Sequence, residues 1–133
     1  MKTLFIAILL FMLNGCLPQE DIYKINYEAV TRGNSIEINT NLDSISFKNF
    51  NTLKKLKLNK KSKTELKKIL SEINVLQLKN IKPTSSKSFT DRKLQATLKV
   101  IKGKETYVTQ TFDHGNPPRE IKALIDMLLK IVK

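Results

Sequence analysis

The sequence predicts an α+β domain in which a mostly antiparallel sheet of about five strands carries two amphipathic helices on one face. Three observations support this fold class. Apolar and polar residues alternate in several segments, as expected for half-buried strands. Two other segments repeat apolar residues every three or four positions, which is typical of amphipathic helices. Short turns join the strands, and parallel strands would need much longer connections.

The first fifteen residues have the features of a bacterial signal peptide, which is removed from the mature chain. Met1-Lys2-Thr3 is a short basic segment, and residues 4–13 (LFIAILLFML) form an unbroken apolar run. At about 1.5 Å per residue this run spans roughly 15 Å, half the hydrocarbon thickness of a bilayer. We therefore expect a signal peptide over residues 1–15 and not a membrane-spanning helix.

Leu13-Asn14-Gly15-Cys16 ends this segment and resembles the bacterial lipobox, whose Cys accepts a diacylglyceryl group through its thiolate. Asn14 departs from the pattern because it is larger than the usual Ala or Ser. The alternative is an ordinary secretory signal with a Cys at its end by chance. We expect lipid attachment at Cys16, with acyl chains such as palmitate as a permanent anchor. Residues 16–21 would then be a lipidated tether.

Residues 22–133 are expected to form a single α+β domain, of ordinary size for one core. Its first strand has one inward face, formed by Tyr23, Ile25, Tyr27 and Ala29. A turn signal at residues 31–34 (TRGN) precedes a second strand at 35–40. Ile45 and Phe47 mark a third strand, and residues 53–58 are either a short strand or a loop.

The middle of the chain predicts the first helix. Ser62-Lys63-Thr64-Glu65 fits a capping box, in which Ser and Glu satisfy free N–H groups of the first turn. The apolar stripe that follows is Leu66, Ile69, Leu70 and Ile73. A buried connector up to Pro83 is expected from Val75, Leu76, Leu78 and Ile81. Residues 84–91 are expected to form a polar loop.

The last third predicts a hairpin and a C-terminal helix. The hairpin's first strand has an apolar face of Leu94, Ala96, Leu98 and Val100. Lys102-Gly103 supplies the turn, and residues 106–112 form the returning strand. Asn116 is a natural N-cap, followed by prolines that suit a first helical turn. The stripe of the last helix is Ile121, Leu124, Ile125, Leu128, Leu129 and Val132.

Composition limits the chemistry of the mature chain. It holds one Cys and one His, so an intramolecular disulfide and a Cys-type metal site are excluded. A zinc site would need His114 with carboxylates at a suitable spacing, which the sequence lacks. We expect no metal and no cofactor.

The net charge is +12, or +11 without Lys2, and it comes from 21 Lys and only 3 Arg. The favoured explanation of this Lys excess is codon bias in an AT-rich genome, and the alternative is a functional basic surface. Arg is the residue that reads phosphates and bases through its fork, and export separates the protein from DNA and RNA. We therefore expect no nucleic-acid partner.

Lys60, Lys61 and Lys63 crowd the predicted start of the first helix, where the helix dipole disfavours cations. Free N–H groups and lysines there form a candidate anion-binding site for lipid or lipopolysaccharide phosphates. The alternative is a solvated face.

Asp113-His114 is the only pair of an acid beside a His. Ser85, Ser86 and Ser88 lack the Gly-x-Ser-x-Gly elbow of a serine nucleophile. A hydrolase using Asp113 and His114 is therefore the less favoured interpretation. The favoured one is that both residues stabilise a strand-to-helix turn through side-chain to backbone hydrogen bonds.

Two segments, residues 27–33 (YEAVTRG) and 112–118 (FDHGNPP), resemble a family of small uncharacterised lipoproteins of Flavobacteria and other Bacteroidetes. The similarity covers about residues 22–133. The resemblance implies no known activity, and it points to Arg32, Asp91, Asp113, His114 and Gly115 as positions of functional or structural importance. Arg32 is expected to pair with Asp91 or Asp113 at one end of the sheet. The alternative is three unrelated surface charges.

These observations leave three functions open. The favoured one is a non-catalytic lipoprotein of the cell envelope that binds a protein or glycan partner. The second is a binder of anionic lipid or lipopolysaccharide through its lysines, and the third is the hydrolase. No Asp follows Cys16, and an Asp there retains lipoproteins in the inner membrane of enterobacteria. We therefore expect the outer membrane, with its periplasmic and surface faces both open.

Overall fold

The computed structural model describes residues 22–84 and 93–133. Its elements in chain order are β1 (Tyr23–Thr31), β2 (Asn34–Thr40), β3 (Ser44–Asn49), β4 (Leu53–Lys57), α2 (Lys60–Glu72), the 3₁₀ helix η1 (Val75–Asn80), β5 (Gln95–Lys102), β6 (Glu105–Val108), β7 (Phe112–Asp113) and α3 (Arg119–Val132). The predicted α+β class with an antiparallel sheet is confirmed.

The sheet is larger than the predicted five strands. Its order is β4-β3-β2-β1-β5-β6, with β7 pairing β5 beyond the end of β6, and every pairing is antiparallel. The segment left open as strand or loop is the edge strand β4, which pairs with β3 although all five of its residues are exposed.

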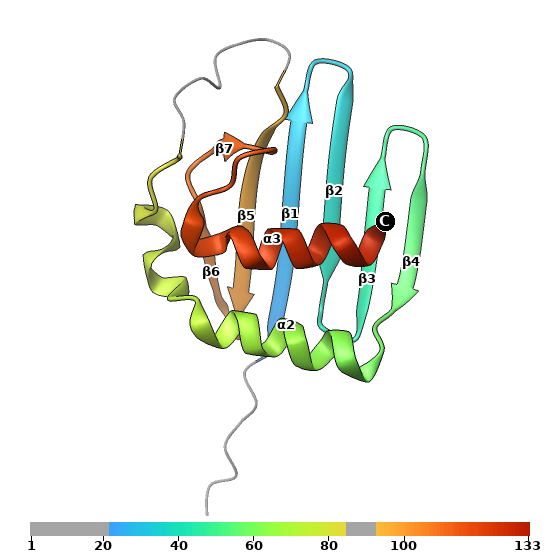
Figure 1. The fold of residues 1–133 in the computed structure, drawn as a ribbon, viewed down its shortest axis with the longest axis vertical. Helices are drawn as coiled ribbons and strands as arrows, with labels where there is room; N and C mark the ends of the chain where they lie inside the picture. Colours follow the sequence, from blue (N-terminus) through green and yellow to red (C-terminus); the bar gives the residue numbers. More distant parts are fainter. Residues whose placement is uncertain (1–21, 85–92) are drawn as a thin grey trace, which may run out of the picture.

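Both α-helices lie on one face of the sheet, as Figure 1 shows. We call this the helix-covered face and the opposite one the helix-free face. The core lies between the helices and the sheet, and its largest fully buried side chains are Ile25, Tyr27, Ile38, Ile45, Leu66, Leu78, Leu98, Phe112, Ile121, Leu124, Ile125 and Leu128. Alternation in β1 and β5 therefore predicted the inward positions correctly, as did the stripe of α3.

The predicted returning strand is interrupted after Val108. Between β6 and β7, three residues (109–111) lie opposite only two of β5, which makes a β-bulge. The buried Thr109 bridges the break, because its N–H donates to Leu98 O (2.9 Å) and its Oγ1 accepts from Leu98 N (3.0 Å). The bulge changes the direction of the strand, so that Asp113 and His114 lie near the end of β1.

Three local predictions around the helices are wrong. Asn59, not Ser62, caps α2: its side chain accepts from Ser62 N at 2.8 Å, and the helix begins at Lys60. Pro118, not Asn116, stands at the N-cap of α3. Leu76, expected to be buried, is 60% exposed on η1, whereas Val75 and Leu78 are buried.

Two glycines make the predicted hairpin turns possible. Gly33 between β1 and β2 has φ +86°, and Gly103 between β5 and β6 has φ +61°. Residues with a Cβ adopt such angles rarely, so these two turns depend on Gly.

Over the ranges that the structure describes, none of the helices is both long enough and apolar enough to cross a bilayer. The predicted signal peptide and tether lie outside those ranges.

Candidate functional site

Two of the cavities lined by described residues lie at opposite ends of the sheet. One lies at the end where β1 turns into β2 and where β7 ends, and we call it the His114 pocket. The other lies on the helix-free face, at the end where β1 begins, and we call it the amide pocket. The sequence predicted candidate residues at the first and none at the second.

The His114 pocket has a volume of about 350 Å³. Its lining residues are Thr31, Asn34, Lys93, Leu94, Asp113, His114, Gly115 and Asn116. Three predicted positions, Asp113, His114 and Gly115, therefore lie together. Arg32 is exposed in the turn between Thr31 and Asn34, two residues that line this pocket.

The predicted ion pair of Arg32 is not formed with Asp113. Within residues 22–84 and 93–133, the ion pairs found join Lys63 to Asp43 and Lys122 to Asp126. The other predicted partner, Asp91, lies outside the described residues, as do Ser85, Ser86 and Ser88.

His114 is held by Tyr27, a residue 87 positions away. The Tyr27 hydroxyl lies 2.6 Å from His114 Nδ1, and the ring centroids are 5.9 Å apart. The His114 side chain thus bonds to a buried phenol and not to the backbone of its turn. Two backbone bonds hold that turn instead, from His114 N to Leu94 O and from Asn116 N to Asp113 O.

Burial sets the protonation of this pair. It raises the pKa of Tyr27, so the phenol stays protonated, and it lowers the pKa of His114, so the imidazole stays neutral near pH 7. A protonated phenol and a neutral imidazole can each donate or accept, so the direction of the bond between the Tyr27 hydroxyl and His114 Nδ1 follows the imidazole tautomer. In either direction, His114 Nε2 lies outside this bond.

The amide pocket has a volume of about 530 Å³, in the usual range for ligand sites. The side chains that reach it from the helix-free face and the adjoining turn are Lys24, Asn26, Asn39, Asn41, Ser44, Ser46, Lys55, Lys57 and Ile101. Strand register brings them together. Lys99, Asn26, Asn39, Ser46 and Lys55 form one continuous row across five strands.

Hydrogen bonds orient the amides of this row. Asn26 Nδ2 donates to Asn39 Oδ1 at 2.7 Å, and Asn39 Nδ2 donates to Glu37 Oε1 at 2.8 Å. A carboxylate only accepts, so Glu37 fixes the direction of both amides. Each amide nitrogen carries two protons, and one proton of each is used in this chain of bonds.

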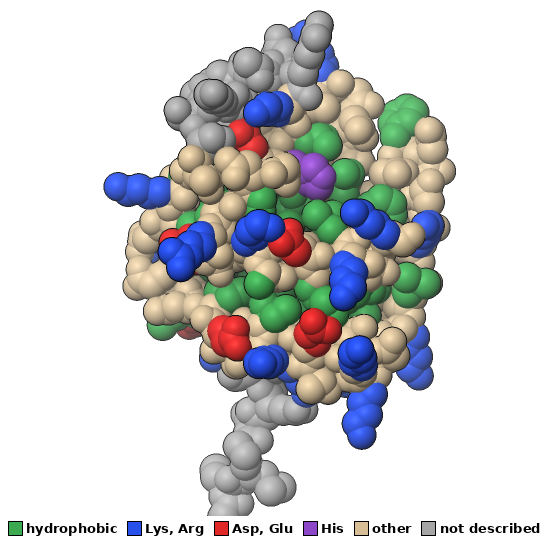
Figure 2. All heavy atoms as spheres, in the orientation of Figure 1, with side chains coloured by type: hydrophobic (Ala, Val, Ile, Leu, Met, Phe, Trp, Pro, Cys, Tyr) green, Lys and Arg blue, Asp and Glu red, His purple; other side chains and the backbone are tan. Residues whose placement is uncertain are grey.

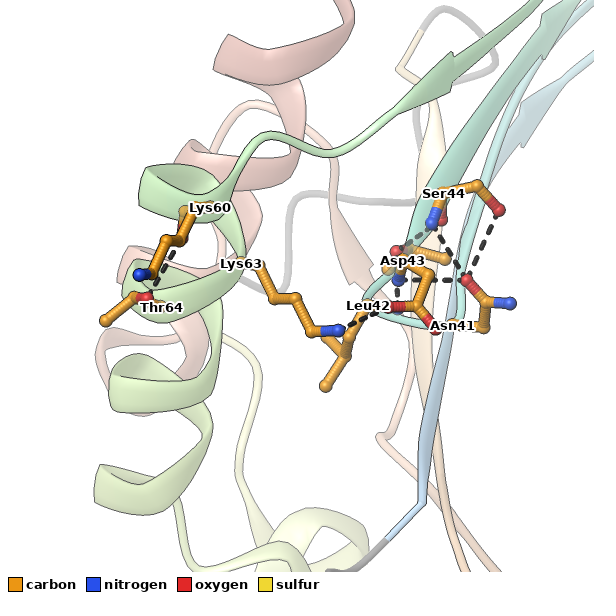
Figure 3. A network of polar contacts seen from close by, with 8 residues as sticks. Asn41, Leu42, Asp43, Ser44, Lys60, Lys63 and Thr64 are labelled. Carbon is orange, nitrogen blue, oxygen red and sulfur yellow. Dashed lines mark hydrogen bonds and ion pairs between the residues drawn. The ribbon is translucent and has the colours of Figure 1, made fainter.

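Asn41 is oriented by the β2–β3 turn, as Figure 3 shows. Its Oδ1 accepts from Asp43 N, Ser44 N and Ser44 Oγ, so what it can still offer a ligand is the Nδ2 group. The remaining amide protons and three lysines make the polar groups of the pocket mainly N–H donors, and apolar side chains such as Ile101 complete the lining. The pocket is therefore suited to a ligand rich in acceptors.

The predicted anion site at Lys60, Lys61 and Lys63 has a different structure from the one expected. All three residues are in the first turn of α2, but Asn59 already caps that turn. Lys63 reaches across to Asp43 in the β2–β3 turn and forms an ion pair (Figure 3). Its hydrogen bond holds the pKa of Asp43 below the usual range. Lys63 thus joins α2 to the sheet.

Sequence reasoning missed Tyr27 and the amide pocket. A phenol at an inward strand position needs a polar partner, which was a usable signal for Tyr27. Outward strand positions often carry charged side chains, but Asn26, Asn39 and Ser46 carry amides and a hydroxyl. This difference was a weaker signal for the pocket.

The fold and its cavities define a small α+β domain with one open sheet face. Comparison with known proteins finds no matching family model, no matching curated protein and no matching solved structure. The resemblance to flavobacterial lipoproteins stays a prediction.

Proposed function

We propose that this chain is a bacterial lipoprotein of the cell envelope, anchored through Cys16, whose domain binds a protein or glycan partner without catalysis. The observation that carries the binding role is the helix-free face. In the part of the chain that the structure describes, no helix covers this face of the six strands, and it mixes charges with exposed apolar side chains. The outward row of Glu28, Glu37, Lys48 and Leu53 lies beside Val30.

The apolar members of this face give it binding potential. Leu53 is 65% exposed and Val30 is 43% exposed, and both point away from the helices. Apolar side chains rimmed by polar ones are the usual composition of a protein contact surface. A glycan partner would instead use the amides and hydroxyls further along the same face.

The anchor is tested by Cys16→Ser. We expect the wild-type chain in the membrane fraction, with a mass that includes acyl chains, and the variant in the soluble fraction without them. Membrane retention of an unacylated variant would contradict the proposal.

The partner is tested by cross-linking in intact cells, followed by mass spectrometry of detergent-solubilised membranes. Val30→Glu with Leu53→Glu should abolish a cross-linked protein partner. Leu76→Glu is the matched control, because Leu76 is 60% exposed but lies on η1. Loss of the adduct in the control, or its persistence in the double variant, would reject the helix-free face as the contact surface. Retention on immobilised envelope glycan would identify the glycan alternative.

A hydrolase using Asp113 and His114 stays the less favoured proposal. A triad would place a carboxylate at His114 Nδ1 to orient the ring, and that atom contacts the Tyr27 hydroxyl. An unchanged phenotype in His114→Ala would remove this candidate.

A further inference from the structure

We propose that the amide pocket binds the phosphate of an anionic phospholipid headgroup, in the membrane that holds the anchor, and so fixes how the domain stands on that membrane. This inference rests on the proposed anchoring through Cys16. It concerns the end of the helix-free face nearest the anchor, and the partner surface around Val30 and Leu53 is separate from it.

The first support is position. β1 begins at Tyr23, seven residues after Cys16, and seven residues reach at most about 25 Å when fully extended. Lys24 is the second residue of β1, Lys57 ends β4, and Ser44 begins β3, so the pocket lies at the end of the sheet where the anchored chain enters. A lipid anchor would thus hold this pocket close to the headgroups.

The second support is charge. Lys24, Lys55 and Lys57 are exposed and line the pocket, and none of the described residues that line it is acidic. Lys104 lies in the β5–β6 turn at the same end, and α2 begins there with Lys60 and Lys61. Basic residues near an anionic membrane surface are attracted to it.

The third support is hydrogen-bond chemistry. The amide orientation set by Glu37 and the turn that uses Asn41 Oδ1 leave the pocket rich in N–H donors. A phosphate group carries only acceptors when it is a diester anion. The rest of the lining is apolar and includes Ile25, Leu56 and Ile101. We therefore place the headgroup phosphate against the N–H donors of the pocket.

The experiment uses the mature lipidated chain, reconstituted in nanodiscs of phosphatidylcholine alone or of phosphatidylcholine mixed with phosphatidylglycerol. Side-chain amide resonances of Asn26, Asn39 and Asn41 report on the pocket directly. We expect these resonances to shift in the anionic discs and to return toward their neutral-disc positions at about 1 M salt, where the Debye length is about 3 Å. Failure of the chain to insert would refute the anchor, whereas insertion without shifts would refute only the headgroup site.

Two triple variants separate a specific site from general attraction. Lys24→Gln, Lys55→Gln and Lys57→Gln should abolish the shifts. Lys68→Gln, Lys130→Gln and Lys133→Gln remove the same charge from exposed helix-layer positions and should preserve them. Equal loss in both variants would overturn the proposal. So would equal shifts produced by inorganic phosphate in neutral discs when anionic lipid produces none, because the ligand would then be free phosphate.

Discussion

The contact between Tyr27 and His114 joins the first strand to the loop before the last helix. Tyr27 is fully buried and His114 is partly buried, so each needs the other as a polar partner. Among the side-chain hydrogen bonds between described residues, this one joins the two residues that are farthest apart in the sequence. At this scale the pair is structural, and burial lowers the pKa of the only imidazole in the chain.

Tyr27→Phe removes the hydroxyl and leaves His114 Nδ1 without its phenol. We expect the free energy of unfolding to fall by about 1–2 kcal/mol, since the partly buried Nδ1 atom loses its hydrogen-bond partner. Urea denaturation measures the change. Tyr107→Phe is the control, because the Tyr107 hydroxyl bonds to Glu105 at an exposed position, and a change within about 0.5 kcal/mol is expected there.

Stability should depend on pH through His114. Its folded pKa is lowered by burial, so the unfolded state binds the proton more tightly. The contribution of neutral His114 to the free energy of unfolding is therefore fully present above the unfolded pKa of about 6.5. This contribution decreases as the pH falls from there through the folded pKa. Urea unfolding at a series of pH values across this range should show that the free energy of unfolding decreases as the pH falls. The decrease should be smaller in His114→Gln. A His114 pKa above 6.5, read from its single imidazole NMR signal, would contradict the assignment.

The elements differ in how far the sequence could predict them. β1, β5 and α3 were predictable because burial on one side imposes a strict period, as at Ile25, Val100 and Leu124. The choice between strand and loop stayed open for β4, because all its residues are exposed and show no such period. The bulge at Thr109 and the pairing of Tyr27 with His114 depend on register between distant strands, which no local pattern encodes. Asn and Ser both cap helix N-termini well, so whether Asn59 or Ser62 caps α2 depends on where β4 ends.

Asn59→Ala should destabilise α2, because the Asn59 side chain satisfies the N–H of Ser62. Loss of an N-cap costs about 1 kcal/mol, read from thermal or urea unfolding. Ser62→Ala tests the capping box that the sequence suggested, and it should change stability by less than about 0.5 kcal/mol. The reverse order of the two effects would restore the capping box.

Thr109→Val should destabilise the sheet more strongly than its small change in shape suggests. Val keeps the shape but leaves Leu98 N without the Oγ1 acceptor in a buried position. A buried unsatisfied N–H costs about 1–3 kcal/mol, and hydrogen exchange at Leu98 should accelerate accordingly. Thr106→Val, on the exposed edge strand β6, should be nearly neutral, and an equal loss there would show that the bulge is not the cause.

The whole molecule is a two-layer domain whose charge is strongly unbalanced. Figure 2 shows basic and acidic side chains interspersed over the helix-covered face, yet the chain carries a net charge of +12. Excess charge of one sign destabilises a compact state through self-repulsion. The folded domain therefore keeps its lysines at some cost in stability.

Salt should relieve this repulsion. Raising NaCl from about 0.01 to 0.3 M shortens the Debye length from about 30 Å to below 10 Å, so the free energy of unfolding should rise, by the order of 1 kcal/mol. Urea unfolding at each salt concentration measures the change. The triple variant at Lys68, Lys130 and Lys133 should show a smaller rise. A fall in stability with salt would mean that attractive pairs dominate the surface.

The exposed edge strand β4 has a consequence for crowding. Under the proposed anchoring through Cys16, copies of the domain on one membrane would be confined to two dimensions, where an exposed strand edge could pair with that of a neighbour. Lys54, Lys55 and Lys57 make three of the five residues of β4 cationic, so two such edges repel each other on approach. We therefore expect the lysine excess to oppose edge-to-edge pairing of β4 between neighbouring copies.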